Sequence, residues 1–197
     1  MLLTYNNLVD LVARGTLAPV APEHLNAASI DLTLGPVLHV EAENPQWEEW
    51  PDPIDLAAKQ SIHTREVVMD EDGYVLEPGE FILASTVEVF HLPAGEPSQP
   101  HLEFIPALAA EYKLKSTLAR NALGHLLAGW CDPGWSGSVL TLELKNESRY
   151  HHLRIRPGMK IGQVVLWAGV PVPDHASYAT KGRYNGDLTT TTSKGLK

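Results

Sequence analysis

Short runs of β-type sequence, each bounded by glycine or proline, constrain the fold of this chain more than any other feature. Four such stretches are SIDLTLGPVLHVEA (29–42), GYVLEPGEFILASTVEVFHL (73–92), GSVLTLELKN (137–146) and LRIRPGMKIGQVVLW (153–167). Glycine and proline each occur 15 times. Many short strands with frequent turns are typical of an all-β barrel or sandwich. We therefore expect an all-β domain.

Helical patterns are confined to two short segments. The N-terminal one has Asn6 or Asn7 as a candidate cap and Gly15 as its end. The second is STLARNALGHLL (116–127), with Ser116 as a candidate cap. One or two short helices should therefore accompany the strands.

Length and composition indicate one domain over residues 1–180. With 197 residues, 44% of them apolar, the chain can bury a substantial core. The stretch HLPAGEPSQPHLEF (91–104) contains three prolines and is typical of a surface loop. The tail, residues 181–197, is polar and rich in glycine and threonine, so it is either a frayed terminus or a flexible lid.

Charge and cysteine content narrow the function. The 15 basic and 24 acidic residues give a net charge of −9, which argues against nucleic-acid binding. The N-terminus lacks a sustained apolar core and contains Asp10, so it does not resemble a signal peptide. No apolar run approaches the roughly 20 residues of a membrane span. Because Cys131 is the sole cysteine, we expect a cytoplasmic protein with no membrane association.

The histidines do not form a recognisable zinc motif. There are nine, but His151 and His152 are adjacent and would point to opposite faces of a strand. The chain contains neither HExxH nor CxxC. A zinc-dependent nucleobase deaminase requires a cysteine pair, which one cysteine cannot supply. We therefore expect no zinc.

Glu143 is the candidate functional residue of the 137–146 strand. In LTLELKN, alternation places Leu140, Leu142 and Leu144 on one face and Glu143 on the other. Such a pattern is typical of a half-buried strand with one solvated face. The local sequence leaves open whether Glu143 faces water or a site.

Two polar segments are candidates for ligand contacts. KSTLAR brings Lys115, Ser116, Thr117 and Arg120 together at a helix start, which suits either a phosphate site or an ordinary capped helix. DPGW (132–135) fits a type II turn with proline second and glycine third. Asp132 at its first position either bonds its own turn or faces a ligand hydroxyl.

Taken in order, the motifs resemble those of dCTP deaminases, a family of the trimeric dUTPase-like superfamily. The similarity covers most of residues 1–194, and its motifs are LNAASIDLTLG (25–35), LEPGEFILASTVE (76–88), KSTLARNAL (115–123), AGWCDPGWSG (128–137), TLEL (141–144), RPGMKIGQVVL (156–166) and GRYNGD (182–187). The resemblance implies a distorted β-barrel or jelly-roll subunit of the dUTPase-like type. It also implies a homotrimer with active sites between subunits. The implied reaction is zinc-independent deamination of dCTP to dUTP and ammonia, with dTTP as a candidate inhibitor.

The resemblance also assigns site residues. Glu143 matches the acid/base, and the other catalytic matches are Ser116, Arg120 and the Ala128 carbonyl, which helps to hold the attacking water. Substrate-binding matches are Lys115, Thr117, Asp132, Thr141, Leu142, Tyr178, Arg183 and Asp187. Mg²⁺ is expected only through the nucleotide phosphates.

Several positions depart from the family pattern. Lys115 stands where many members carry arginine, and Arg183 and Asp187 replace the common lysine and glutamine. The strand before Glu143 is one residue longer, which predicts a β-bulge within residues 138–140. The loop over residues 91–110 is also longer than expected.

The predicted mechanism uses one carboxylate twice. Glu143 would take a proton from the water that adds to cytosine C4, then deliver protons to N3 and the leaving amine. Lys115, Thr117 and Arg183 would hold phosphates, and the segment beyond Tyr178 would close over the nucleotide.

Two alternatives remain. A dUTP diphosphatase, or an enzyme that both deaminates dCTP and cleaves dUTP to dUMP, would use Asp132, which matches a water-activating aspartate of the superfamily's hydrolases. A non-catalytic regulator that binds deoxynucleoside triphosphates would account for the changes at positions 115 and 187.

Overall fold

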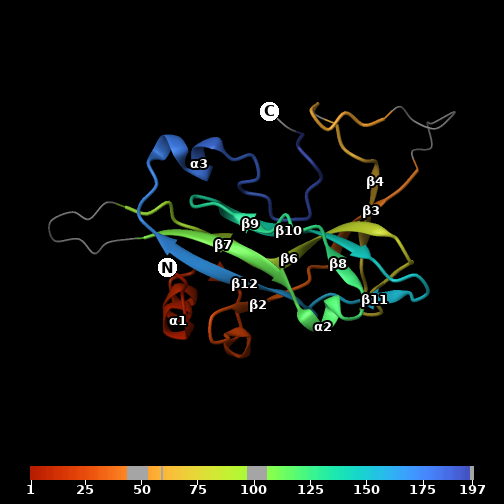
Figure 1. Ribbon diagram of the computed structural model, residues 1–197, viewed down its shortest axis with the longest axis horizontal. Helices are drawn as coiled ribbons and strands as arrows, with labels where there is room; N and C mark the ends of the chain where they lie inside the picture. Colours follow the sequence, from red (N-terminus) through yellow and green to blue (C-terminus); the bar gives the residue numbers. More distant parts are fainter. Residues whose placement is uncertain (44–52, 59, 97–105, 196–197) are drawn as a thin grey trace.

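The protein is built mainly from antiparallel strands, as Figure 1 shows. The computed structural model describes residues 1–43, 53–58, 60–96 and 106–195. The larger sheet has six strands, in the order β4-β3-β6-β10-β8 with β1 also paired to β6. Its strands are β1 (Leu17–Ala18), β3 (Val37–Glu41), β4 (Thr64–Val68), β6 (Phe81–His91), β8 (Leu123–His125) and β10 (Ser136–Asn146).

The second sheet has four strands in the order β2-β12-β7-β9, and a two-stranded sheet pairs β11 with β5. These strands are β2 (Ile30–Thr33), β5 (Tyr74–Leu76), β7 (Ala107–Leu114), β9 (Trp130–Cys131), β11 (Leu153–Ile155) and β12 (Lys160–Gly169). One hydrophobic core joins both main sheets, with Leu142 of β10, Phe90 of β6 and Val164 of β12 all fully buried. The expected all-β fold is confirmed.

Helices are few and short. They are α1 (Tyr5–Ala13), α2 (Ser116–Ala119), α3 (Tyr178–Lys181) and the 3₁₀ turns η1 (Pro22–His24) and η2 (Asp174–Ala176). Figure 1 shows α3 and the C-terminal segment on one side of the sheets and α2 on the other. Among the described residues, no helix has the length and apolar character needed to cross a membrane.

The four predicted strand stretches are confirmed, because they contain β2, β3, β5, β6, β10, β11 and β12. The predicted bulge is also confirmed, since the β10–β6 register shifts between Val139 and Thr141. Residues 97–105 of the expected surface loop lie outside the described residues. The preceding part ends β6 at His91 and continues without a helix to residue 96.

Both helix predictions need correction. The N-terminal helix is capped by Thr4, and Asn7 instead accepts a hydrogen bond from the Thr4 N–H through Oδ1 at 3.2 Å. The helix predicted over 116–127 ends at Ala119, and its cap position is Lys115 rather than Ser116. Its second half is β8, which pairs with β10 because Leu123 is more stable buried against the core than on a helix. Ala122 has a φ of 63°, a left-handed conformation that ends the helix before β8.

The polar tail packs onto the larger sheet over its described length. Thr190 is buried, and its hydroxyl donates to the Val37 carbonyl at 2.7 Å. The Val139 N–H donates to the Asp187 carbonyl at 2.9 Å, and the Trp135 indole donates to the Tyr184 carbonyl at 2.7 Å. Hydrogen bonds compensate here for the scarcity of apolar side chains. Movement of this tail as a lid stays a prediction.

Candidate active site

A pocket of about 490 Å³ opens between strand β10, the turn after β9 and the tail. Apolar side chains dominate its wall, and its polar groups are few, which suits a small organic ligand. It is lined by Ile54, Leu56, Gln60, Ser61, Ile62, Phe81, Leu83, Ala128, Trp130, Cys131, Asp132, Trp135, Val139, Leu140, Thr141, Glu143, Tyr178, Tyr184, Asp187, Thr191, Thr192 and Ser193.

Glu143 reaches this pocket because of the strand alternation. Leu142 and Leu144 are fully buried in the core, so Glu143 between them projects from the opposite face. Its side chain is 25% exposed, and its Oε2 atom is buried without a hydrogen-bond partner among the described residues. The question left open by the sequence is thereby answered, since Glu143 lines a pocket rather than an open surface.

His125 of β8 faces the same carboxylate. Its Nε2 atom lies 3.3 Å from Glu143 Oε2, and its side chain is only 4% exposed. Neither atom meets hydrogen-bond geometry with a described residue. Because the Leu127 N–H donates to His125 Nδ1 at 3.2 Å, the neutral ring carries its proton on Nε2. Nε2 is thus the protonated ring nitrogen and lies 3.3 Å from the Glu143 carboxylate, without hydrogen-bond geometry.

An aromatic ring supports this histidine. The rings of Tyr112 and His125 have centroids 4.7 Å apart. Burial, together with the charge of Glu143, raises the pKa of Tyr112, so its hydroxyl stays protonated. Sequence reasoning missed His125 because a lone histidine in GHLL has no motif, and the signal lies only in the pairing of Leu144 with His125, next to Glu143.

The DPGW turn places Asp132 at the pocket wall. Gly134 has a φ of 92°, and the Trp135 N–H donates to the Asp132 carbonyl at 3.2 Å, which confirms a type II turn. The Asp132 side chain accepts a hydrogen bond from the Trp130 indole at 3.0 Å. Burial and the neighbouring Asp132 charge raise the pKa of the Cys131 thiol to about 12, so this pocket residue is not a thiolate nucleophile.

The tail supplies the remaining polar wall. The Thr191 N–H donates to the Thr141 hydroxyl at 3.2 Å, which ties the tail to β10. Asp187 pairs with Lys194, whose Nζ lies 2.8 Å from Asp187 Oδ2 and 4.9 Å from the Tyr184 ring centroid. The Lys194 ammonium therefore offsets the negative charge of Asp187.

The predicted site residues fall into two groups. Pocket-lining residues are Ala128, Asp132, Thr141, Glu143, Tyr178 and Asp187. Ser116 and Thr117 of α2, and Arg120 directly after it, are exposed and do not line the pocket of their own chain. Lys115 instead forms an ion pair with Asp31.

Two further predicted residues lie near the pocket but not in its wall. Leu142 is fully buried, so only its backbone could meet a ligand. Arg183 donates to the Lys194 carbonyl at 3.3 Å within the tail. Among the described residues, no three His, Cys, Asp or Glu side chains gather as a metal site.

Comparison with known proteins identifies the family of this chain. A family model described as dCTP deaminase-like matches residues 2–169. A "dCTP deaminase, dUMP-forming" of Acidothermus cellulolyticus is 36% identical over 200 residues, covering 98% of this chain and 95% of the relative. The protein of the same name from a Nocardioides species is 37% identical over 195 residues, covering 96% and 92%.

A solved structure agrees on the fold. The 2'-deoxycytidine 5'-triphosphate deaminase of Agrobacterium tumefaciens superposes with a TM-score of 0.59 at 19% identity. The match covers 85% of this chain, which corresponds to about half, 48%, of that longer protein. The chain belongs to the dCTP deaminase-like family.

Proposed function

We propose that this protein deaminates dCTP and that Glu143 is the proton-transferring group. The observation that carries the proposal is a carboxylate with a buried, unpartnered oxygen, 3.3 Å from the Nε2 atom of His125, inside a mostly apolar pocket. A positioned carboxylate in such a site can serve as both base and acid. Full-length relatives named as dCTP deaminases support the same substrate.

The proposed reaction is a hydrolytic exchange at cytosine C4. Water adds to C4 as Glu143 takes one of its protons, which forms the C4–O bond. Glu143 delivers this proton to N3, then takes the remaining proton from the new C4 hydroxyl and passes it to the amine, so that the C4–N bond breaks, ammonia leaves and the C4 carbonyl forms. Ala128 lines the pocket, and its carbonyl would accept a hydrogen bond from the attacking water. The backbone of Thr141 and Leu142 would meet the base.

The site requires a second copy of the chain. Ser116 and Thr117 of α2, and Arg120 directly after it, are exposed and do not reach the pocket of their own subunit. Large apolar side chains are also exposed here, with Trp130 of the pocket wall 58% accessible and Leu127, which precedes the pocket residue Ala128, 88% accessible. Exposed apolar groups beside an incomplete site favour an interface. We infer a homotrimer in which α2 of one subunit completes the pocket of its neighbour.

A subunit-mixing experiment tests this assembly. Glu143→Gln and Ser116→Ala remove groups that would act in one shared site from different chains. Each variant alone should be inactive, whereas mixed assemblies should regain part of the activity. A protein that elutes as a monomer, or mixed variants that stay inactive, would refute the shared site.

We expect Mg²⁺ to enter the pocket with the nucleotide phosphates, where Asp132 is the described carboxylate without an ion pair. Of the three described pocket carboxylates, Glu143 faces His125 and Asp187 pairs with Lys194, whereas Asp132 forms no ion pair with a described residue. Mg²⁺ binds phosphate oxygens together with one or two carboxylates. When bound, Mg²⁺ would neutralise charge on the triphosphate. Arg183 and Tyr178 would contact the nucleotide from the C-terminal segment.

The relatives favour formation of dUMP rather than release of dUTP, because their names include "dUMP-forming". The balanced reaction then consumes two waters and yields dUMP, ammonia and pyrophosphate. Asp132 is the pocket carboxylate without an ion pair and is the candidate to activate the second water. A non-catalytic regulator is disfavoured by the same relatives. The single cysteine supports our prediction of a cytoplasmic enzyme.

One incubation tests the activity. Protein, dCTP and Mg²⁺ are incubated, and dCTP, dUTP, dUMP, ammonia and pyrophosphate are each quantified. We expect equal amounts of ammonia, pyrophosphate and dUMP. Ammonia with dUTP alone would restrict the enzyme to deamination, and the absence of ammonia would overturn the proposal.

A further inference from the structure

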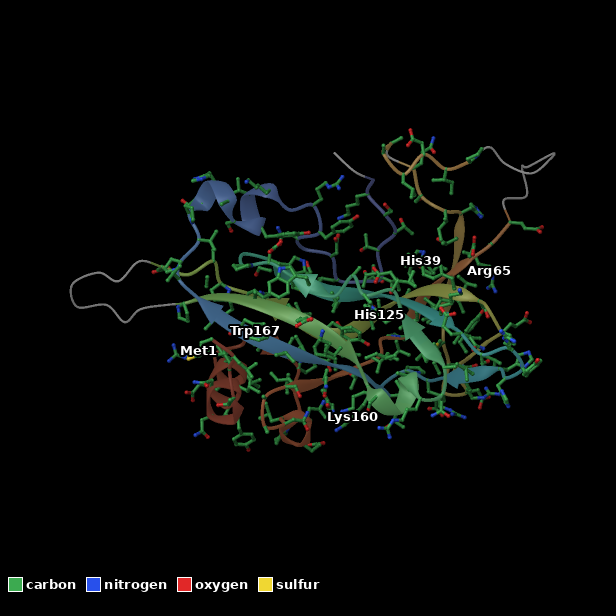
Figure 2. The ribbon with its side chains drawn as sticks, in the orientation of Figure 1. Met1, His39, Arg65, His125, Lys160 and Trp167 are labelled. Atoms are coloured by element: carbon green, nitrogen blue, oxygen red, sulfur yellow. The ribbon has the colours of Figure 1, made fainter. Side chains whose placement is uncertain are left out.

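A buried carboxylate on β2 anchors the start of α2. Asp31 is 4% exposed, and three side chains surround it. Lys115 Nζ lies 2.8 Å from Oδ1, Lys160 Nζ lies 3.0 Å from Oδ2, and Asn26 Nδ2 lies 2.9 Å from Oδ1. Figure 2 shows Lys160 beside α2, at the edge of the molecule away from α3 and the tail. This cluster is separate from the pocket that holds Glu143.

Helix α2 cannot hold its own direction. It contains four residues, and its cap residue, Lys115, makes no side-chain capping bond. One helical turn is unstable by itself, so contacts with the rest of the fold must orient it. Lys115 provides two such contacts at the start of α2. Its N–H donates to the Ile161 carbonyl at 3.2 Å, and its ammonium pairs with Asp31.

The ion pair with Asp31 makes Lys115 a poor candidate for phosphate binding. An ammonium at 2.8 Å from a buried carboxylate is already neutralised. Burial acts to raise the pKa of Asp31, but hydrogen bonds from Lys115, Lys160 and Asn26 outweigh it and lower that pKa, so the carboxylate stays charged. The Lys115 side chain is therefore held within the protein by Asp31, although the sequence suggested that it binds phosphate.

We propose that Asp31 is a positioning residue that acts through Lys115 to fix α2, and thereby the Ser116 hydroxyl and the Arg120 guanidinium. The inference rests on the proposed function, because those two groups matter only if α2 completes a deaminase site. Asp31 itself touches no substrate. A 1 Å displacement of groups that position a substrate can lower the rate about 100-fold.

Lys160 offers a matched control. It contacts the same carboxylate at nearly the same distance, but it belongs to β12 rather than to the start of α2. Lys160→Met and Lys115→Met each leave Asp31 with one cation. Both variants should therefore lose similar stability, while only Lys115→Met releases α2.

Kinetics with dCTP separate positioning from phosphate binding. Asp31→Asn and Lys115→Met should each lower kcat at least 10-fold, and the double variant should be no worse than the more impaired single variant. The kcat of Lys160→Met should stay within twofold of the wild-type value. Lys115→Arg keeps the positive charge and should retain most of the activity. If Lys115 instead binds phosphate, Lys115→Met raises KM with kcat unchanged, and Asp31→Asn leaves both near wild type. That result would overturn the inference.

Hydrogen exchange provides a readout that does not depend on activity. The Ala119 and Arg120 amides donate within α2, to the Lys115 and Ser116 carbonyls. Asp31→Asn and Lys115→Met should speed their exchange at least 10-fold, and Lys160→Met should not. Equal exchange in all variants would refute the anchor, even if the wild type releases no ammonia and the proposed function fails. Thermal melts confirm folding, and if Asp31→Asn is unfolded the Lys115 and Lys160 variants still decide.

Discussion

Replacing His125 tests whether this residue assists Glu143 in the reaction. Replacing it with alanine removes the only described side-chain group within 4 Å of Glu143 that can carry a positive charge. The His125 Nε2 and Glu143 Oε2 atoms lie 3.3 Å apart without hydrogen-bond geometry, and we expect them to form a bond when the substrate is bound. Hydrogen bonds to charged groups are worth about 1.5–3 kcal/mol. The lower part of that range, about 1.5–2 kcal/mol, corresponds to roughly a 10- to 30-fold loss in rate.

We therefore expect His125→Ala to lower kcat for ammonia release roughly 10- to 30-fold, with a smaller change in KM. His125→Gln can present an amide N–H near the position of Nε2 and should recover part of the loss. His152→Ala, at an exposed position, is the matched control and should retain full activity. A folded His125→Ala enzyme with kcat within twofold of wild type would refute the reasoning.

Three further predictions concern stability and the tail. Because the pKa of Asp31 is lowered on folding, its ion pairs stabilise the protein near neutral pH and are lost as acid protonates the carboxylate, so the Tm difference between wild type and Asp31→Asn should shrink from pH 7 to pH 3 in circular dichroism. Leu142→Ala removes a fully buried side chain and should cost about 2–5 kcal/mol in urea unfolding, and a loss below about 1 kcal/mol would contradict the core assignment. Trp135→Phe removes the indole bond to the Tyr184 carbonyl, worth about 1 kcal/mol, and should speed tryptic cleavage after Arg183 several-fold, whereas unchanged cleavage would show that this bond does not hold the tail.

The strands could be predicted from sequence because their signals are local. The alternation around Glu143 and the extra residue near Ser138 correctly predicted a half-buried strand with a bulge. Strand β7, ALAAEYKL, was missed because alanines carry little strand propensity, and its place in the sheet depends on pairing with β12.

Tertiary contacts determine the structure at the positions where local sequence patterns gave wrong predictions. Helical periodicity continues past Ala119, but residues 123–125 form a strand because pairing with β10 buries Leu123. The tail looked too polar to pack, yet its backbone and hydroxyl groups bond to β3 and β10. Such bonds leave no pattern in the sequence of the tail itself.

The candidate site could be predicted in part. Motif resemblance selected Glu143, Asp132 and Ala128, which the structure brings to one pocket. It could not find the His125–Glu143 or Asp31–Lys115 contacts, because each joins residues that are distant in sequence. The separation of α2 from the pocket of its own chain is not visible in the motifs themselves, since chain order does not fix which surfaces lie together.

Ammonia release from dCTP by Glu143→Gln tests the central claim most directly. Glutamine keeps the size of the side chain but can neither take nor return the proton. Positioned acid–base groups contribute about 10²–10⁴-fold to a rate. We predict that the variant binds dCTP with nearly wild-type affinity and releases ammonia at least 100-fold more slowly. A variant that binds dCTP and releases ammonia at close to the wild-type rate would contradict the account.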